Sequence, residues 1–431
     1  MRRIAVAVLA AAGIATVAGW ASEQEGKLSN EIVVSNTEEL CSVLKSDKMK
    51  PGVTVLIAPG TYGNLWHDTG NLRGTEEAPI VIRAQDPKNP PVLDAEGKKD
   101  QALGISGACY LVIRDLVLKN ARDNGLLLGP GREGSWKERG PDKGNAHHIR
   151  IENCTVLNTN LRGNHDAIKL AGVEYFTVRN CWTENWGGSG IDANGSRCGV
   201  IEDNVFICAA GAKNNSGITL KGGGDNFLIQ RNFFKNVSSE QAVRIGDPQT
   251  ENVGPGKFSV TKVEVGGNRF VGGAEPVGWL SADGGHVHHN TMVLPESRFL
   301  RARGRFDCGD PKFNNNLVVF DSTKMKDGKV SIKPIAPEMA KKFSFHHNAW
   351  FEVNGKAFDI NAELPTPEQD GVYGVDPKLD SLDSPKMKSQ TADPRLKGIG
   401  ADAYEGPLST PTGFGWRKAG ETTGPNYRLP K

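Results

Sequence analysis

One short pattern returns along most of this chain and limits what the chain can fold into. An apolar residue is followed by two mostly polar residues, then by Asn or Cys, and then by further apolar residues. The pattern is found at IENC (151–154), VRNC (178–181), IEDN (201–204), IQRN (229–232), VGGN (265–268), VHHN (287–290), FNNN (313–316) and FHHN (345–348), and IRDL (113–116) fits with Leu in the last place. The shorter separations between fourth residues cluster between 22 and 28. Such a period, with short β-rich runs and Gly-rich corners, is typical of a β-solenoid.

We therefore expect an all-β fold, a single right-handed parallel β-helix whose coils stack about 4.8 Å apart. An Asn at the same place in each coil can hydrogen-bond its neighbours, and a buried column of amides is tolerable only when every member finds such partners. Cys154 and Cys181 extend this column, and we expect stacked thiols there rather than a disulfide. A β-sandwich is the alternative, but its turns would show no fixed Asn phase.

Both ends of the chain fit this interpretation. An amphipathic segment opens at Thr37-Glu38-Glu39-Leu40, and a helix capped near Asn36 or Thr37 would cover the first coil. The first strands are expected at 54–62 and 79–84, and the repeat fades after about residue 352. We assign residues 22–358 to the β-helix with its N-terminal cap, and 359–431 to an irregular segment packed on it.

The N-terminal residues resemble a secretory signal rather than part of the fold. Arg2 and Arg3 precede an apolar run, and Gly19-Trp20-Ala21 offers a cleavage site before Ser22. The run is shorter than the roughly 20 residues that a membrane span needs. Residues 1–21 are therefore interpreted as a signal peptide, which implies a secreted or periplasmic protein with no membrane segment after cleavage.

Composition narrows the partners. The chain has 52 basic and 50 acidic residues, and a balance so close to neutral makes nucleic acid an unsuitable partner. Because the number of cysteines is odd, at least one of the seven thiols stays unpaired. The sequence contains no CxxC pair, which argues against a zinc ribbon. A monomer is expected.

A second strand precedes the Asn column in each coil. Six segments align without gaps: AIKLAG (167–172), GIDANG (190–195), GITLKG (217–222), AVRIGD (242–247), VGWLSA (277–282) and FLRARG (299–304). Alternation of faces along a strand predicts two outward columns. The first holds Lys169, Asp192, Thr219, Arg244, Trp279 and Arg301, and the second holds Ala171, Asn194, Lys221, Gly246, Ser281 and Arg303.

The outward columns predict a mostly cationic surface with Asp192 as its one acid. Outward charges on a solenoid are by default only solvated, but an exposed Trp279 among them suits stacking on a sugar ring. We therefore expect an anionic polysaccharide to lie along this surface. The substrate-binding candidates are Lys169, Asp192, Asn194, Trp279, Arg301 and Arg303.

The chemistry that fits this surface is cleavage of a uronic-acid polymer by β-elimination. A lysine can remove the C5 proton when its neutral form is accessible, and an arginine can stabilise the carboxylate or serve the leaving oxygen. Lys221 and Arg244 are expected on neighbouring coils. The spacing between strands and along a strand places their Cα atoms roughly 8 Å from each other.

At these residues the sequence resembles a known family. GITLKGGGDNFLIQRNFFKNVSSEQAVRIGD (217–247) is similar to the active-site coils of the chondroitin B lyase and alginate lyase family, right-handed β-helix enzymes of the pectin-lyase-like superfamily. The resemblance implies that Lys221 is the base and Arg244 the acid or carboxylate partner. Many members of that family hold calcium with acidic residues just before the Lys, where this chain has Asn214 and Ser216.

The metal and the reaction type leave alternatives open. Asp166, Asp192 and Asn214 are weak calcium ligands as a set, because hard cations need several carboxylates, so we expect no required cofactor, with calcium the possible exception. A β-helix also supports uronate C5-epimerases, glycoside hydrolases and non-catalytic carbohydrate-binding proteins. A hydrolase needs two carboxylates at the scissile bond, and the surface offers Asp192 essentially alone.

Overall fold

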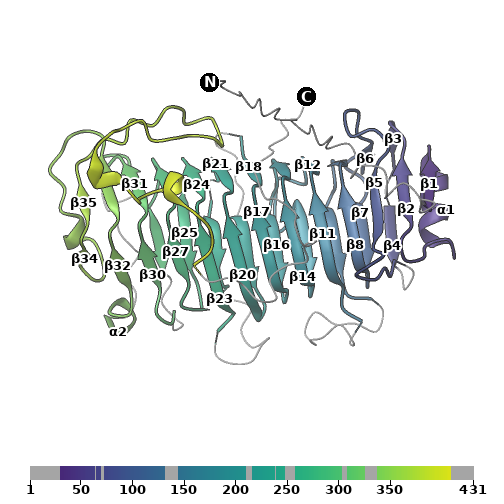
Figure 1. The fold of residues 1–431 in the computed structure, drawn as a ribbon, viewed down its shortest axis with the longest axis horizontal. Helices are drawn as coiled ribbons and strands as arrows, with labels where there is room; N and C mark the ends of the chain where they lie inside the picture. Colours follow the sequence, from purple (N-terminus) through teal and green to yellow (C-terminus); the bar gives the residue numbers. More distant parts are fainter. Residues whose placement is uncertain are drawn as a thin grey trace, which may run out of the picture.

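The computed structural model describes residues 30–63, 65–68, 72–131, 144–209, 216–237, 239–247, 258–302, 308–325 and 337–408. Its strands stack side by side into one long parallel β-helix, with the chain advancing from the α1 end to the opposite end (Figure 1). This confirms the expected fold. The interpreted signal peptide (1–21), Arg303 and Asn214 lie outside the described residues.

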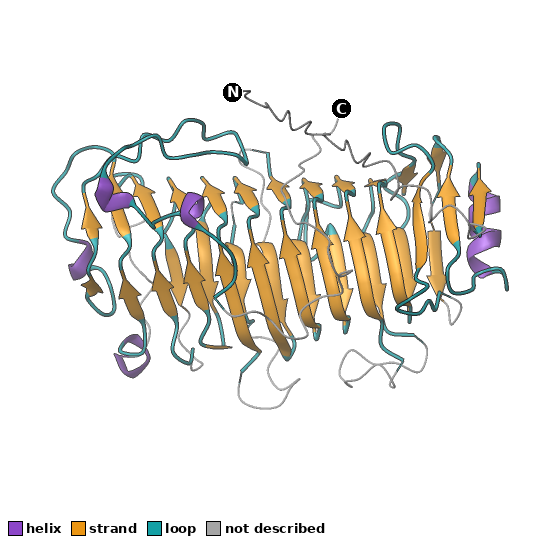
Figure 2. Ribbon diagram, viewed as in Figure 1, coloured by secondary structure: helices purple, strands orange, loops and turns teal. Residues whose placement is uncertain are grey.

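Three parallel sheets form the walls of the β-helix (Figure 2). Sheet A has 14 strands in the described chain: β1 Glu31–Val34, β2 Thr54–Ile57, β5 Ile80–Ala84, β8 Cys109–Arg114, β11 His147–Glu152, β14 Glu174–Arg179, β17 Arg197–Glu202, β20 Gly224–Gln230, β23 Val260–Gly266, β26 Ala282–Asp283, β27 His286–His288, β30 Lys312–Asn314, β32 Ser344–His346 and β34 Glu368–Gln369.

Sheet B has 12 strands in the same part of the chain: β3 Thr61–Tyr62, β6 Val92–Asp94, β9 Val117–Lys119, β12 Thr155–Leu157, β15 Trp182–Glu184, β18 Val205–Ile207, β21 Phe233–Lys235, β24 Arg269–Val271, β28 Thr291–Val293, β31 Leu317–Phe320, β33 Ala349–Glu352 and β35 Val372–Tyr373. Sheet C has nine described strands: β4 Leu65–Asp68, β7 Gln101–Ser106, β10 Asn124–Gly129, β13 Ile168–Ala171, β16 Ser189–Asn194, β19 Ser216–Lys221, β22 Gln241–Ile245, β25 Glu275–Trp279 and β29 Leu300–Ala302.

Each complete coil runs from sheet C to sheet A and then to sheet B. The corner between sheets A and B holds the Asn ladder, a buried column made of Asn204, Asn232, Asn268, Asn290, Asn316 and Asn348. The side-chain amide of each of the first five donates to the Oδ1 of the next, at 2.9 to 3.1 Å. The predicted ladder is therefore confirmed. Cys154 and Cys181 are buried at the N-terminal side of the column, and all seven cysteines are free thiols.

Apolar side chains from all three sheets fill the interior. Phe206, Phe234 and Phe270 occupy one place in successive coils, and their rings stack with centroids 4.7 and 4.9 Å apart. Stacking of identical side chains follows from the parallel register, which places equivalent residues directly above one another (Phe206 opposite Phe234, Phe234 opposite Phe270). The core is thus as repetitive as the sequence.

The N-terminal end is closed by helix α1 (Thr37–Lys45), which lies beside β1 (Figures 1 and 2). The Oδ1 of Asn36 accepts the backbone N–H of Glu39 at 2.9 Å, which is the expected N-cap. Leu40 and Leu44 are buried against the first coil. β1 was not among the strands expected from the sequence.

The chain beyond residue 358 adds a last strand to sheet A and to sheet B and then, from residue 374, returns along the outside of sheet B. It contains η3 (Ile360–Ala362), the short strands β34 and β35, η4 (Pro394–Leu396) and η5 (Ala401–Ala403), and a further helix, α2 (Pro337–Ala340), lies before it. We call residues 374–408 the strap; they run back across the coils in yellow in Figure 1. Met387 and Ile399 of the strap are buried against the outer face of sheet B. Within the described chain, no helix has the length and apolar character needed to cross a membrane.

Candidate active site

The outward side chains of sheet C form the candidate site, and the strand register decides which residues belong to it. Lys169 lies opposite Asp192, Asp192 opposite Thr219, and Thr219 opposite Arg244. In the second column Ala171 lies opposite Asn194, and Asn194 opposite Lys221. The gapless alignment of the sequence is therefore correct for these four strands.

The alignment is wrong at the next strand, and this removes Trp279 from the site. Arg244 lies opposite Gly278, while Trp279 lies opposite Ile245 and points into the core. Its side chain is 0% exposed and packs edge-on against Phe343, with ring centroids 5.5 Å apart. A one-residue slip in register exchanges the two faces of a strand, so the expected sugar-stacking Trp279 is a core residue.

Lys221 and Asp192 form the centre of the site. The Nζ of Lys221 donates to Oδ2 of Asp192 at 3.0 Å, and the Lys221 side chain is 12% exposed. Asp192 itself is 0% exposed, because the side chains of its neighbours cover it. Burial alone would raise the pKa of the Asp192 carboxyl, but the ammonium groups of Lys169 and Lys221 outweigh burial and hold that pKa below its ordinary value. Asp192 is therefore a buried partner of two lysines and not the exposed substrate-binding residue expected from the sequence.

Lys169 joins Asp192 to a second buried acid. Its Nζ donates to Oδ2 of Asp192 and, at 3.2 Å, to Oδ2 of Asp166. Asp166 is 1% exposed, and its Oδ1 accepts the backbone N–H of Ser189 at 2.7 Å. Burial and the neighbouring Asp192 raise the pKa of Asp166 to about 7. Burial would lower the pKa of Lys169, but the two carboxylates raise it above its ordinary value. We call Asp166, Lys169, Asp192 and Lys221 the charge cluster.

Arg244 is held more loosely than the lysines. One terminal nitrogen, Nη2, lies 3.4 Å from Oδ1 of Asp247, and the Arg244 side chain is 14% exposed. Its Nε is buried and has no hydrogen-bond partner within the described chain. Arg244 and Lys221 thus lie on adjacent strands of one face, as expected. Because a guanidinium has four N–H donors besides the buried Nε, the one ion pair seen in the described chain, with Asp247, leaves terminal N–H groups of Arg244 for a ligand.

Arg301 is engaged by acids that the sequence reading missed. Its Nη1 lies 3.3 Å from Glu275 and 3.5 Å from Glu240. Glu275 also accepts a hydrogen bond from the side-chain amide of Gln241 at 2.5 Å. The outward surface of sheet C is therefore less cationic than expected. Asp166 and Asp247 each lie three residues from their basic partners, and that spacing was the available sequence signal. Glu240 lies just before β22 and Glu275 is the first residue of β25, and neither position gave such a signal.

Asn194 and Gly222 shape the backbone beside Lys221. The Oδ1 of Asn194 is buried without a partner among the described residues. It would lie 2.0 Å from a Cβ at position 222, and Gly222 has a φ of +70°. A side chain at position 222 would therefore collide with Asn194 and strain the turn that leads from sheet C to sheet A.

Metal ligation finds limited support in this geometry. Asp166 and Asp192 both bind the ammonium of Lys169, which occupies the space between their carboxylates. In the described part of the chain, no group of three or more His, Cys, Asp or Glu side chains is placed to hold a metal ion.

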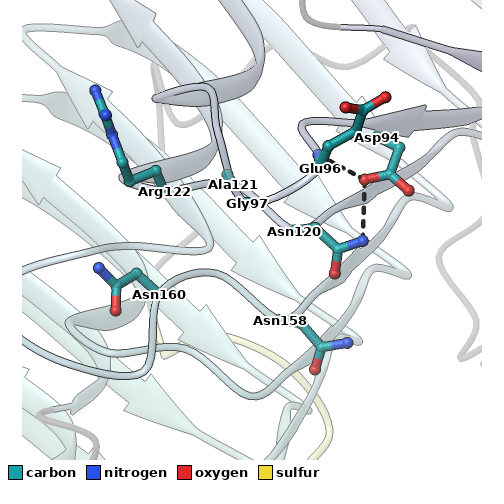
Figure 3. Close-up of a pocket in the computed structure, with 8 residues that line it drawn as sticks. All are labelled: Asp94, Glu96, Gly97, Asn120, Ala121, Arg122, Asn158 and Asn160. Atoms are coloured by element: carbon teal, nitrogen blue, oxygen red, sulfur yellow. Dashed lines mark hydrogen bonds between the residues drawn. The ribbon is translucent and has the colours of Figure 1, made fainter.

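A separate cleft of about 710 Å³ lies at the corner between sheets B and C of the early coils (Figure 3). Asp94 accepts the side-chain amide of Asn120 at 2.9 Å within it, and Glu96 and Arg122 line it. None of the charge-cluster residues line this cleft. Because Asp94 and Glu96 would repel a polyanion, we place the candidate site on sheet C instead.

These features define a right-handed parallel β-helix that carries ion-paired lysines and arginines along one sheet. The family model for the right handed beta helix region matches residues 143–291. No curated protein matches the sequence.

Solved structures share the fold. The A-module of the mannuronan C-5 epimerase AlgE6 from Azotobacter vinelandii is similar over 75% of this chain and 91% of its own, with 14% identity and a TM-score of 0.51. An alginate lyase from Paenibacillus sp. str. FPU-7 covers 71% of this chain and 96% of its own, with 15% identity and a TM-score of 0.48. A GH136 lacto-N-biosidase from Eubacterium ramulus covers 80% and 68%, with 12% identity and a TM-score of 0.48. At such identities the likeness concerns the fold alone.

Proposed function

We propose that this protein is a polysaccharide lyase that cleaves a uronic-acid-containing polymer by β-elimination. Lys221 is the base, and Arg244 is the carboxylate partner or the acid. Membership of the chondroitin B lyase and alginate lyase family, suggested by residues 217–247, belongs to the same proposal, as does action outside the cytoplasm.

The observation that carries the proposal is the shared face of Lys221 and Arg244. Thr219 lies opposite Arg244, and Lys221 is two residues further along the same strand, so both side chains leave sheet C on its outer side. Their Cα atoms are about 8 Å apart by the spacing of parallel strands. Long side chains from such positions can converge on one sugar ring.

The reaction follows from these two groups. Arg244 binds the uronate carboxylate and stabilises the charge that develops on it. Lys221 first releases one ammonium proton to solvent, and the neutral amine, still donating to Asp192, then takes the proton from C5. The electron pair of the C5–H bond forms the C4–C5 double bond, the C4–O4 bond breaks, and O4 takes a proton from solvent water as it leaves. The products are a new reducing-end fragment and an unsaturated uronate.

We include no metal ion in this step, because the ammonium of Lys169 lies between the two buried carboxylates that were the metal candidates within the described chain. A hydrolase is disfavoured for a related reason. Asp166 and Asp192 are buried at 1% and 0% exposure and share Lys169, so they do not flank a bound sugar. A C5-epimerase shares the proton abstraction at C5, and its product distinguishes it.

The test is an assay of the purified chain on alginate, dermatan-type glycosaminoglycan, pectate and bacterial exopolysaccharides, with and without excess chelator. We expect new ultraviolet absorbance from unsaturated uronates on one of them, undiminished by the chelator. Lys221→Ala and Arg244→Ala are each expected to lower the rate by at least about 100-fold, as loss of a group that acts in the transition state does.

Lys262→Ala is the matched control, because Lys262 is an exposed lysine on sheet A and should leave the rate unchanged. Saturated ends in the products would indicate a hydrolase. Altered uronate stereochemistry without chain shortening would indicate an epimerase. Binding without either change, unaffected by Lys221→Ala, would indicate a non-catalytic β-helix.

A further inference from the structure

The position of Lys169 differs from that of a ligand-binding lysine. Its ammonium contacts one carboxylate from its own coil, Asp166, and one from the next coil, Asp192. The Lys169 side chain is only 16% exposed. Two of its three N–H donors are therefore directed at buried protein groups rather than at the outer surface.

The two carboxylates need this ammonium. Asp192 has one oxygen, Oδ2, that accepts from both Lys169 and Lys221, while its Oδ1 is buried without a partner in the described chain. Asp166 lies close enough to Asp192 for their charges to repel. Without Lys169, the repulsion and the loss of one donor would leave Asp192 free to move away from Lys221.

We propose that Lys169 is a positioning residue for Lys221. Its ammonium balances Asp166 and Asp192, and this fixes Oδ2 of Asp192 at the place where it holds the Nζ of Lys221. The claim that Lys169 supports catalysis by Lys221 rests on the proposed function. The claim that the four charges form one balanced unit does not depend on it.

Charge balance makes the inference testable by a double substitution. With all four groups ionised, the charge cluster is neutral. Lys169→Met leaves one uncompensated negative charge, whereas the pair Asp166→Asn and Lys169→Met restores neutrality and keeps the Asp192–Lys221 ion pair. Because Lys169 lowers the pKa of Asp166, its removal raises that pKa further, so the variants are compared at about pH 8 and at about pH 9.5, where the Asp166 carboxyl is charged in Lys169→Met as well.

The first readout is kinetic, on the polymer that the wild-type protein cleaves. We expect Lys169→Met to lower kcat by about 100-fold with KM within about 3-fold, because misplacing a catalytic group by about 1 Å has an effect of this size. The double variant should regain at least about 10-fold of the lost kcat. The control is Lys119→Met on sheet B, whose lysine pairs with Asp94 at 3.3 Å; it should leave kcat unchanged.

The second readout is the Tm of each variant, which needs no activity. Lys169→Met should lower Tm, and the double variant should have a higher Tm than Lys169→Met alone. A raised KM with unchanged kcat would overturn the inference, since it would make Lys169 a substrate-binding residue. A double variant no better than Lys169→Met in both readouts would also overturn it. If the wild-type protein cleaves no acidic polymer, the proposed function fails, and the Tm comparison still decides whether the four charges act as a unit.

Discussion

The cations of sheet C differ in how firmly acidic side chains hold them. Lys169 and Lys221 share the buried Asp192, and Arg301 lies between Glu240 and Glu275. Within the described residues Arg244 has one ion-pair partner, Asp247, at 3.4 Å, against two for Arg301, while the Nε atoms of both arginines are buried without a partner there. A carboxylate ligand must compete with the ion pairs that a guanidinium already forms. Such a ligand should therefore bind Arg244 more readily than Arg301.

This difference predicts unequal effects of removing the two arginines. Arg301→Ala should lower the free energy of unfolding by about 1–3 kcal/mol, because it leaves the buried Glu275 with fewer partners. Its kcat/KM should stay within about 3-fold of the wild-type value, while Arg244→Ala should lose most activity. Urea unfolding and kinetics on the same preparations measure both. An Arg301→Ala protein of normal stability that has lost as much activity as Arg244→Ala would contradict this ordering.

At the scale of single elements, the Asn ladder has a direction. Each of its amides donates to a backbone carbonyl of the preceding coil and to the side-chain oxygen of the next coil, so the bonds between side chains all run toward the C-terminal coils. Asn348, the last member, donates to both carboxylate oxygens of Glu368. A carboxylate only accepts hydrogen bonds, so Glu368 ends the series without needing a further acceptor. Trp350 also donates to Glu368 at 3.1 Å, which helps to satisfy this buried acid. Burial raises the pKa of Glu368, against the lowering effect of these donors.

The same elements show what the sequence can reveal. The ladder was predictable because a buried amide recurs at one place per coil, and the outward positions of Lys169, Lys221 and Arg244 followed from alternation along neighbouring strands. Trp279 was misplaced because β25 begins with Glu275 and its register is offset by one residue from the aligned segment. Local spacing carries no information about such an offset. The partners Glu240 and Glu275 were missed because they meet Arg301 only through coil stacking.

The ladder predicts a large loss of stability when one amide is removed. Asn268 accepts from the backbone and side chain of Asn232 and donates to Asn290, all inside the molecule. Asn268→Ala should lower the free energy of unfolding by about 2–5 kcal/mol, because it leaves several buried polar groups without partners. Urea unfolding measures this, with the exposed Asn160→Ala as control. Equal stabilities for these two variants would mean that the ladder contributes little.

At the scale of the whole molecule, the strap covers an apolar face that the β-helix would otherwise expose. The outward residues of sheet B beneath it are buried and belong to a second apolar cluster: Val205, Phe233, Val271, Val293 and Leu317. Polar contacts also hold the strap. Arg269 pairs with Asp402 at 2.7 Å, and the hydroxyl of Tyr404 donates to Oε1 of Gln230 at 2.7 Å. The strap therefore makes the outer face of sheet B part of the interior.

Removal of the strap should change the association state of the protein. A variant lacking residues 374–431 exposes a continuous apolar strip on sheet B, and exposed strips of this kind promote association. We expect the full chain to be a monomer, and the shortened chain to form oligomers or aggregates with a lower Tm. Light scattering over a concentration series measures the mass of each. Asp402→Ala is the control, because it removes one ion pair of the strap and should remain monomeric. A shortened chain that stays monomeric with an unchanged Tm would show that the strap does not protect sheet B.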